Sequence, residues 1–418
     1  MSTAAESIYS LFRTQPRAGH QWIGLEVERL VTRKGQPQIL HYPDAVSKLL
    51  RELIQKKGWS LEYEWNDNPL ALRKNLHTIS VEPGGQFEIS PAPRKSVGEL
   101  KTLFDELDSE VLATDEGQTW QWLHLAVNPY EDALQISLLP SPRYLLMNDY
   151  FQKVPEAKNR TPARGQEMMR LTAGLQINLD FDTDVEGVEM YQAANAIAPY
   201  LSALFSNSPL YKNGRSSALS ERHLIWQKAD ALRSGFYDWS FSKQMTVAEY
   251  ADRISKIPLM YAYDEAGKVW DPQGKSLHEL PSSLWKANAL AALRQIFTEV
   301  RFKPCCVEIR FLDAVGPEDR YAATAMAVGL LYDAENRRVI LEDHESAETL
   351  RSRMDTGARE GLKSDLIFMK LQNLLMAAKL GCERRQKQEE KFLEPVEARL
   401  NSRKTPAEDY LHEKGLAA

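Results

Sequence analysis

Polar side chains, acidic, amide or arginine, stand two positions apart in four segments of this sequence: IGLEVERLV, SVEPGGQFEIS, LTAGLQINLDF and CCVEIRFLDA. Successive side chains of a β-strand point to opposite faces of a sheet, so residues two apart project from the same face. If the four segments are strands, each therefore places polar groups side by side. The residues concerned are Glu26, Glu28, Glu82, Gln86, Glu88, Gln176, Asn178, Asp180, Glu308 and Arg310.

Such a sheet face has the groups that bind divalent cations and phosphates. Magnesium prefers oxygen ligands in octahedral geometry and is usually shared with the phosphates of a substrate. An arginine beside it neutralises a phosphoryl group during transfer. One pair such as Glu26 and Glu28 is more often a solvated sheet face, but four segments together favour a metal–phosphate site over a merely polar surface. The break Pro83-Gly84-Gly85 is typical of a bulge beside a ligand.

The elements that must position these residues are readable from periodicity and capping. Strands are expected at 22–32, 78–90, 172–181 and 307–312. Helices are expected at 44–57, 96–112, 186–206, 319–334 and 364–385, with another beginning at Thr246. Because strands and helices do not alternate strictly, the sequence predicts an α+β fold on an antiparallel sheet. No GxGxxG or GxxxxGK[ST] segment follows a strand, so ATP, if used, would lie on the sheet.

Composition excludes several classes of protein. The chain has 418 residues, 43% of them apolar, and a net charge of −6, which argues against nucleic-acid binding. No apolar stretch reaches the roughly 20 residues of a membrane span, and no secretory signal opens the chain. Cys305, Cys306 and Cys382 are the only cysteines and form neither a disulfide framework nor a zinc motif. These features predict a cytoplasmic protein, with Cys305 and Cys306 as small core residues at the start of a strand.

In their order along the chain, the motifs resemble a known family. GLEVERL, SVEPGGQFEIS, TAGLQINLDF, ALFSNSPLYKNG, ERHLIWQKADALRSG and CCVEIRFLDA are similar to the plant and proteobacterial type of glutamate–cysteine ligase, a branch of the glutamine synthetase-like carboxylate–amine ligases. The resemblance implies a glutamine synthetase-like antiparallel sheet that forms a concave active site flanked by helices. It implies a catalytic domain over 1–385 and a C-terminal helical extension, 386–418, packed on it.

The resemblance also implies roles for individual residues. Arg310 would contact the phosphates of ATP, with Gln86 and Asn178 beside the nucleotide, and Arg310 and Arg233 would be catalytic. Two or three magnesium ions would be held by Glu26, Glu28, Glu82, Glu88, Gln176 and Glu308. Glutamate would be bound by Arg222, Trp226, Arg233, Thr172 and Met169.

The implied reaction begins with attack of the glutamate side-chain carboxylate on the γ-phosphate of ATP, and the amine of cysteine then displaces phosphate. The chain departs from the family where EIRFLDA replaces EMRGAD and where Thr172-Ala173-Gly174 replaces Thr-Cys-Thr or Thr-Ala-Ser. The plant regulatory cysteines have no evident counterparts. Two alternatives stay open: a ligase with another acceptor amine, and a catalytically silent regulatory homologue. A monomer or a homodimer is expected.

Overall fold

The computed structural model describes residues 3–14, 21–153, 164–242 and 244–416. Within them, a nine-stranded sheet has the order β14-β15-β7-β1-β5-β4-β3-β2, with β6 also paired to β1, and every pairing in it is antiparallel. Its strands are β1 Ile23–Arg33, β2 Ser60–Trp65, β3 Asn68–Lys74, β4 His77–Val81, β5 Phe87–Ser90, β6 Trp120–Leu123, β7 Gly174–Asp180, β14 Val300–Lys303 and β15 Cys306–Asp313. The predicted α+β class is confirmed.

Fifteen α-helices surround this sheet in the described residues. They are α1 Thr3–Thr14, α2 Asp44–Lys57, α3 Val97–Leu112, α4 Pro142–Lys153, α5 Gly165–Leu171, α6 Asp184–Leu204, α7 Glu221–Gln227, α8 Val247–Ser255, α9 Trp285–Arg294, α10 Pro317–Leu331, α11 Ala334–Glu342, α12 Ala347–Glu360, α13 Asp365–Arg385, α14 Glu394–Ser402 and α15 Pro406–Glu413. Three two-stranded ribbons complete the regular structure: β8 Leu210–Tyr211 with β9 Gly214–Arg215, β10 Ser234–Gly235 with β13 Phe297–Thr298, and β11 Ala262–Tyr263 with β12 Val269–Trp270.

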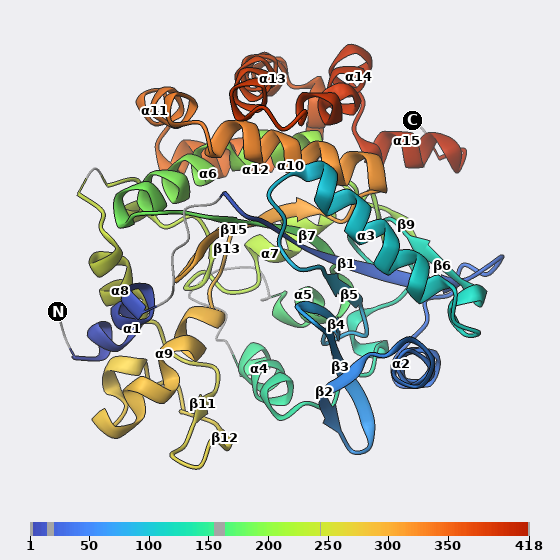
Figure 1. Ribbon diagram of the computed structural model, residues 1–418, viewed down its shortest axis with the longest axis vertical. Coiled ribbons are helices and arrows are strands. Elements are labelled where there is room, and N and C mark those ends of the chain that lie inside the picture. The colour runs from blue at the N-terminus through green and yellow to red at the C-terminus, as the bar shows by residue number, and fades with distance from the viewer. Residues whose placement is uncertain (1–2, 15–20, 154–163, 243, 417–418) are drawn as a thin grey trace.

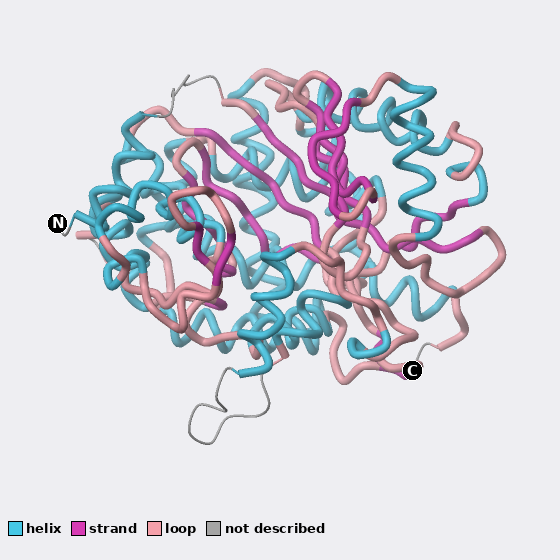
Figure 2. Tube along the Cα trace, turned by 90° about the horizontal axis from the view of Figure 1, so that it is seen from below, coloured by secondary structure: helices cyan, strands magenta, loops and turns pink. Residues whose placement is uncertain are grey.

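The helices form layers on the two sides of the sheet (Figure 1). Helices α6, α10, α12 and α13 lie above it, whereas α4, α5 and α9 lie below. Seen from below, the strands cross the middle of the molecule with helices around them (Figure 2). Alternation decides which side chains meet which layer: Leu25, Val27, Ile177 and Ile309 are at most 2% exposed and belong to the hydrophobic core. The polar residues between them therefore face the opposite side.

Local sequence signals account for several helix boundaries. Helix α2 begins at Asp44 and ends before Gly58, whose φ of 71° is the left-handed conformation that glycine adopts easily. Asp44 lies in the first turn, where its negative charge interacts favourably with the helix dipole. Pro43, the N-cap residue before it, makes no side-chain hydrogen bond to the helix. Ser96 caps α3 by accepting from the amide of Glu99, and Thr246 caps α8 in the same way.

The expected strand at 78–90 is wrong, because the chain reverses within it. Strands β4 and β5 form a hairpin in which Val81 pairs with Phe87, and the turn between them carries Glu82. Gly85 has a φ of 89°, and a Cβ on Gly84 would lie 2.3 Å from the carbonyl oxygen of Arg170. The glycines thus permit a turn rather than the expected bulge.

The residues after Arg385 share the core of the rest of the chain. Leu393, Val396 and Leu400 belong to the same hydrophobic cluster as the sheet and the helices that cover it. The predicted division into a catalytic domain, 1–385, and an extension, 386–418, stays a prediction.

Candidate active site

The sheet borders a cleft of about 570 Å³ on the side away from α6 and α10. Strands, the β4–β5 turn and helices on the near side all contribute to its wall. Polar and charged side chains that line it are Glu26, Glu28, Ser80, Glu82, Gln86, Glu88, Arg143, Thr172, Gln176, Arg294, Arg301, Lys303 and Arg310. Met147, Met168, Met169, Trp226, Tyr261 and Phe297 are among its apolar walls.

Strand register arranges the polar residues in rows across the sheet. Glu28 lies opposite Glu88, and Glu88 lies opposite Ser80 on the next strand. Two positions along β1, Glu26 lies opposite Gln176. A further row joins Asn178, Glu308 and Arg301 on β7, β15 and β14. The shared face inferred from spacing in β1, β7 and β15 is therefore present.

One end of this surface is acidic, with Glu88 buried and Glu28 and Glu82 half-buried. Burial, and then the carboxylate of Glu82, raise the pKa of Glu28 to about 7. Burial, and then the carboxylates of Glu82, Glu26 and Glu28, raise the pKa of Glu88 well above its ordinary value. Burial likewise raises the pKa of Glu82. We refer to Glu28, Glu82 and Glu88 as the acidic end.

The hydrogen bonds of the acidic end come mostly from neutral groups. Glu28 accepts from the amide of Gly174 at 2.7 Å and from Nε2 of Gln176 at 2.6 Å. Glu88 accepts from the hydroxyls of Ser80 at 2.8 Å and Ser90 at 3.2 Å. Buried carboxylates that repel one another fit the donor set of a hard divalent cation. In the described part of the chain, however, no three His, Cys, Asp or Glu side chains are gathered closely enough to hold a metal as they stand.

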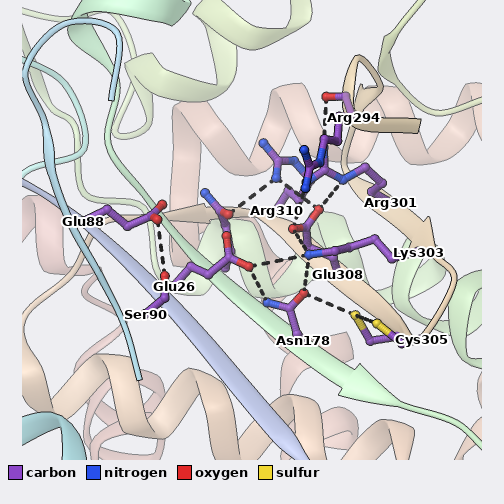
Figure 3. Close-up of polar contacts among 12 residues, drawn as sticks. Glu26, Glu88, Ser90, Asn178, Arg294, Arg301, Lys303, Cys305, Glu308 and Arg310 are labelled. Atoms are coloured by element: carbon purple, nitrogen blue, oxygen red, sulfur yellow. Dashed lines mark hydrogen bonds and ion pairs between the residues drawn. The ribbon is translucent and has the colours of Figure 1, made fainter. Parts of the chain in front are cut away.

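The other end of the surface is cationic, and Glu308 lies at its centre (Figure 3). The carboxylate of Glu308 is 0% exposed and accepts from Arg301 Nε at 2.5 Å, Lys303 Nζ at 2.9 Å and Arg310 Nη1 at 3.1 Å. These cations hold its pKa well below the ordinary value despite burial. One carboxylate oxygen of Glu26 lies 3.6 Å from Lys303 Nζ. We refer to Arg301, Lys303, Glu308 and Arg310 as the basic end.

Several predicted residues have their polar atoms occupied by the protein itself. Asn178 donates to Glu26 at 2.9 Å and accepts from Lys303 at 3.1 Å. Gln86 donates to the carbonyl oxygens of Met169 and Thr172 and accepts from the amide of Gly84. Gln86 therefore fastens the β4–β5 turn to the segment after α5. The expected contacts of Gln86 and Asn178 with the nucleotide stay predictions.

Trp226, Thr172 and Met169 form one wall of the cleft, as the predicted substrate contacts require. Trp226 Nε1 donates to Thr172 Oγ1 at 3.1 Å. Arg222 lies behind this wall: it is 3% exposed, its guanidinium stacks on Trp226 at 4.9 Å, and Nη2 donates to the carbonyl of Arg310 at 2.9 Å. A Cβ on Gly174 would lie 2.6 Å from that Nη2, so the glycine that departs from the family pattern makes room for Arg222.

Arg233 is not among the residues that line the cleft, and its predicted contact with substrate stays a prediction. Its side chain is 0% exposed and donates to Asp230 at 2.6 Å, Tyr150 at 2.9 Å and the carbonyl of Pro258 at 2.8 Å. A further bond goes to the carbonyl of Gln295. Because these internal acceptors occupy the guanidinium, Arg233 holds chain segments together in this arrangement and presents no free donor to the cleft.

The sequence analysis missed four cleft residues that carry positive charge: Arg143, Arg294, Arg301 and Lys303. Arg301 and Lys303 alternate in VRFK, a strand pattern that Pro304 separates from Cys305 and that could have identified them. Arg143 and Arg294 lie on helices α4 and α9, whose periodicity does not distinguish a cleft residue from a surface one.

Comparison with known proteins gives one family. Residues 22–415 match glutamate–cysteine ligase family 2 (GCS2). The chloroplastic glutamate–cysteine ligase of Arabidopsis thaliana is 30% identical over 408 residues, which cover 94% of this chain and 74% of that protein. Chloroplastic glutamate–cysteine ligase B of Oryza sativa subsp. japonica is 30% identical over 409 residues, which cover 94% of this chain and 79% of that protein.

A solved structure shows the same fold. The glutamate–cysteine ligase of Francisella tularensis, crystallised in complex with AMP, superposes with a TM-score of 0.56 at 14% sequence identity. The match covers 94% of this chain and 84% of the other. At this identity the likeness concerns the fold.

The predicted cytoplasmic location is contradicted by the curated relatives, whose names place them in the chloroplast. A low cysteine count indicates reducing conditions, which do not distinguish one compartment from another. Within the described residues, no helix combines the length and the apolar character that crossing a membrane requires.

Proposed function

Because the chain belongs to glutamate–cysteine ligase family 2, we propose that it joins the γ-carboxylate of glutamate to the amine of cysteine while ATP is converted to ADP and phosphate. The observation that carries this function is the charge separation within one cleft. Carboxylates with raised pKa values gather at the acidic end, whereas Arg301, Lys303 and Arg310 gather at the basic end. Phosphoryl transfer needs both, since a polyphosphate must be bound and its charge neutralised.

The triphosphate of ATP belongs at the basic end. Three cations share the buried Glu308 carboxylate, so their positive charge is only partly compensated. Arg310 also lies over the ring of Trp226 at 5.6 Å, which fixes its guanidinium between the two ends of the cleft. We therefore assign Arg310 the contact with the phosphoryl group that is transferred.

The acidic end is where this family's magnesium would be held, by Glu28, Glu82 and Glu88, with Glu26 and Gln176 next to them. Bound there, magnesium would offset the negative charge of carboxylates and phosphates. Glu308, a predicted ligand, is instead neutralised by three cations. Two or three ions remain our expectation for the number bound.

The chain's own residues contribute alignment and exclusion of water. An oxygen of the glutamate γ-carboxylate forms a bond to the γ-phosphorus, and the bond from that phosphorus to the bridging oxygen of ADP breaks. The cysteine amine then attacks the acyl carbon, loses a proton and displaces phosphate. The wall of Trp226, Thr172 and Met169 limits the access of water to the acyl phosphate. No protein nucleophile is needed.

Isotope transfer tests this activation step. Glutamate labelled with 18O in its γ-carboxylate is incubated with ATP, magnesium, cysteine and the purified chain. One labelled oxygen is expected in each phosphate released, because the carboxylate oxygen stays on phosphorus when the amine attacks. Unlabelled phosphate would exclude an acyl phosphate.

The acceptor is tested by ADP release with cysteine, 2-aminobutyrate and simple alkyl amines in parallel. We expect cysteine to give the highest kcat/KM. Release that is faster with another amine would assign a different acceptor, and no release with any amine would support the silent homologue.

A further inference from the structure

Two adjacent cysteines lie at the turn between β14 and β15, where the basic end of the cleft meets solvent. Pro304 and Cys305 form the turn, and Cys306 begins β15 opposite Lys303. Cys305 is exposed and lines the cleft, whereas Cys306 is 8% exposed. Their sulfurs are 3.8 Å apart, and the sulfur of Cys306 lies 3.4 Å from Oδ1 of Asn178 (Figure 3).

We propose that Cys305 and Cys306 form a dithiol site that captures a trivalent arsenical carrying one organic substituent. Such an arsenical forms two bonds to sulfur, the number of thiols that this turn supplies. A structural zinc or a similar cation usually requires four ligands, and among the described residues no third Cys, His, Asp or Glu completes a metal-binding group here. Two thiols therefore match this arsenical and fall short of the four ligands of a zinc site.

The spacing of the sulfurs favours a bridging atom over a disulfide. Adjacent Cα atoms are about 3.8 Å apart across a trans peptide, below the lower limit of about 4.4 Å usual for disulfide-bonded cysteines. The sulfurs must also approach from 3.8 Å to a bond of about 2.05 Å. An atom inserted between them removes the need for that approach.

The capture step is balanced without an oxidant. With phenylarsine oxide, two As–S bonds form, the As–O bond breaks, and the two thiol protons leave with that oxygen as water. Arsenic remains trivalent. The contact with Cys306 and the ammonium of Lys303 lower the pKa of Cys305 to about 6, which supplies the thiolate for the first bond.

Capture would also inhibit the ligase, a consequence that rests on the proposed function. Loss of the Cys306 proton removes its contact with Asn178, whose Oδ1 also accepts from Lys303. The phenyl group would occupy the cleft where Cys305 lines it, beside the proposed phosphate site. Cys382 provides an internal control, because it is 0% exposed and lies in α13 on the far side of the sheet.

The test treats the full chain and its Cys305→Ser, Cys306→Ser and Cys382→Ser variants with phenylarsine oxide. A monothiol wash follows, and intact mass together with a count of free thiols gives the bound arsenical. We expect one arsenical per chain, with two thiols lost, in the wild type and in Cys382→Ser. In Cys305→Ser and Cys306→Ser, we expect no adduct that survives the wash. Dithiothreitol should remove the adduct from the wild type and from Cys382→Ser.

An adduct that survives the monothiol wash in Cys305→Ser would overturn the site. Loss of the adduct from the wild type during that wash would overturn it as well. Should Cys306→Ser fail to fold, Cys305→Ser decides alone, since Cys305 is an exposed turn residue. This binding result does not depend on ligase activity, so it remains interpretable if the proposed reaction is wrong. An adduct that leaves the rate of ADP release unchanged would overturn the inhibition.

Discussion

Glu88 and Glu308 are both glutamates on one face of the sheet. The surroundings of Glu88 disfavour its charged form, whereas those of Glu308 favour it. Both are buried, with exposures of 8% and 0%. Burial and three other glutamates raise the pKa of Glu88 far above its ordinary value, whereas Arg301, Lys303 and Arg310 keep that of Glu308 far below it. Burial alone therefore does not set the charge of a carboxylate; the cations around it do.

This contrast assigns different tasks to the two ends of the cleft. Glu308 is needed by the protein, because without it three cations would repel one another in a largely buried site. Among the described residues, no cation is in hydrogen-bond contact with Glu88, which accepts from two serine hydroxyls. Burial and the neighbouring carboxylates disfavour the charge of Glu88, so an acid at this position costs stability, which is why we assign Glu88 to the binding of a ligand.

The largest expected effect is on stability at the basic end. Glu308→Gln removes the common partner of Arg301, Lys303 and Arg310 and should lower the free energy of unfolding by about 3–5 kcal/mol, as when one member of a buried ion pair is removed. Urea denaturation followed by circular dichroism measures this change. Glu88→Gln is the matched control and should change stability by only about 1 kcal/mol in either direction. Equal losses in the two variants would remove the distinction between the ends.

The second prediction concerns turnover, and here the larger effect is expected at the acidic end. Glu88→Gln and Glu28→Gln should each lower kcat about 100-fold or more, equivalent to about 2.7 kcal/mol in the activation barrier, because each removes a charge proposed to bind magnesium. Initial rates of ADP release at saturating ATP, glutamate and magnesium decide. Ser90→Ala is the control, since it removes one hydrogen bond to Glu88 and leaves the charge in place. Full activity in either Gln variant would exclude the acidic end from catalysis.

The strand spacing predicted the face of the sheet but not the charge state of its residues. Glu26, Glu28, Gln176 and Glu308 were placed together because the period of a strand is local and independent of the rest of the fold. The cations that neutralise Glu308 come partly from β14, which pairs with β15 through a two-residue turn. Which acid receives them depends on strand pairing, and periodicity does not reveal pairing.

Two features of the structure could not be predicted from the sequence, for the same physical reason. Arg233 lies in a segment that resembles a glutamate-binding stretch, but its partners Asp230, Tyr150 and Gln295 come from three separate parts of the chain. The strand expected at 78–90 keeps its alternation on both sides of a turn, so the pattern persists while the direction reverses. Long-range contacts and chain reversals are thus the features that this sequence leaves undetermined.

The third prediction compares two arginines, of which Arg310 lines the cleft and Arg233 does not. Arg310→Lys should raise the KM for ATP or lower kcat by about 10- to 100-fold, because lysine cannot reproduce the planar guanidinium contacts. Arg233→Lys should instead lower the free energy of unfolding by about 2 kcal/mol, from lost hydrogen bonds to a charged group, with little change in either KM. Steady-state kinetics and urea denaturation on both variants separate the two roles. A strong and selective rise in the KM for glutamate in Arg233→Lys would restore its predicted role at the substrate.

The smallest effect is the pH dependence of stability without divalent cations. The folded state raises the pKa of Glu28 from 4.5 to about 7, so between these values the folded chain binds more protons at this site than the unfolded chain. The free energy of unfolding should therefore fall as pH rises through that window. Glu82 and Glu88, whose pKa values are also raised, act in the same direction. Glu308, whose pKa is lowered, contributes its dependence below pH 4.5 instead.

Glu28→Gln isolates this contribution, because it removes one titrating group and reduces the repulsion felt by Glu82 and Glu88. Across pH 5 to 8 in EDTA, stability should fall less in the variant than in the wild type, by on the order of 1–2 kcal/mol. Magnesium should reduce the fall in the wild type, since it binds the ionised carboxylates of the folded chain and stabilises that state by mass action. Urea denaturation at each pH, with EDTA or with magnesium, measures both effects. Parallel curves for wild type and variant in EDTA would mean that Glu28 is already ionised at pH 5, and Glu28 would then resemble Glu308 in keeping its charge.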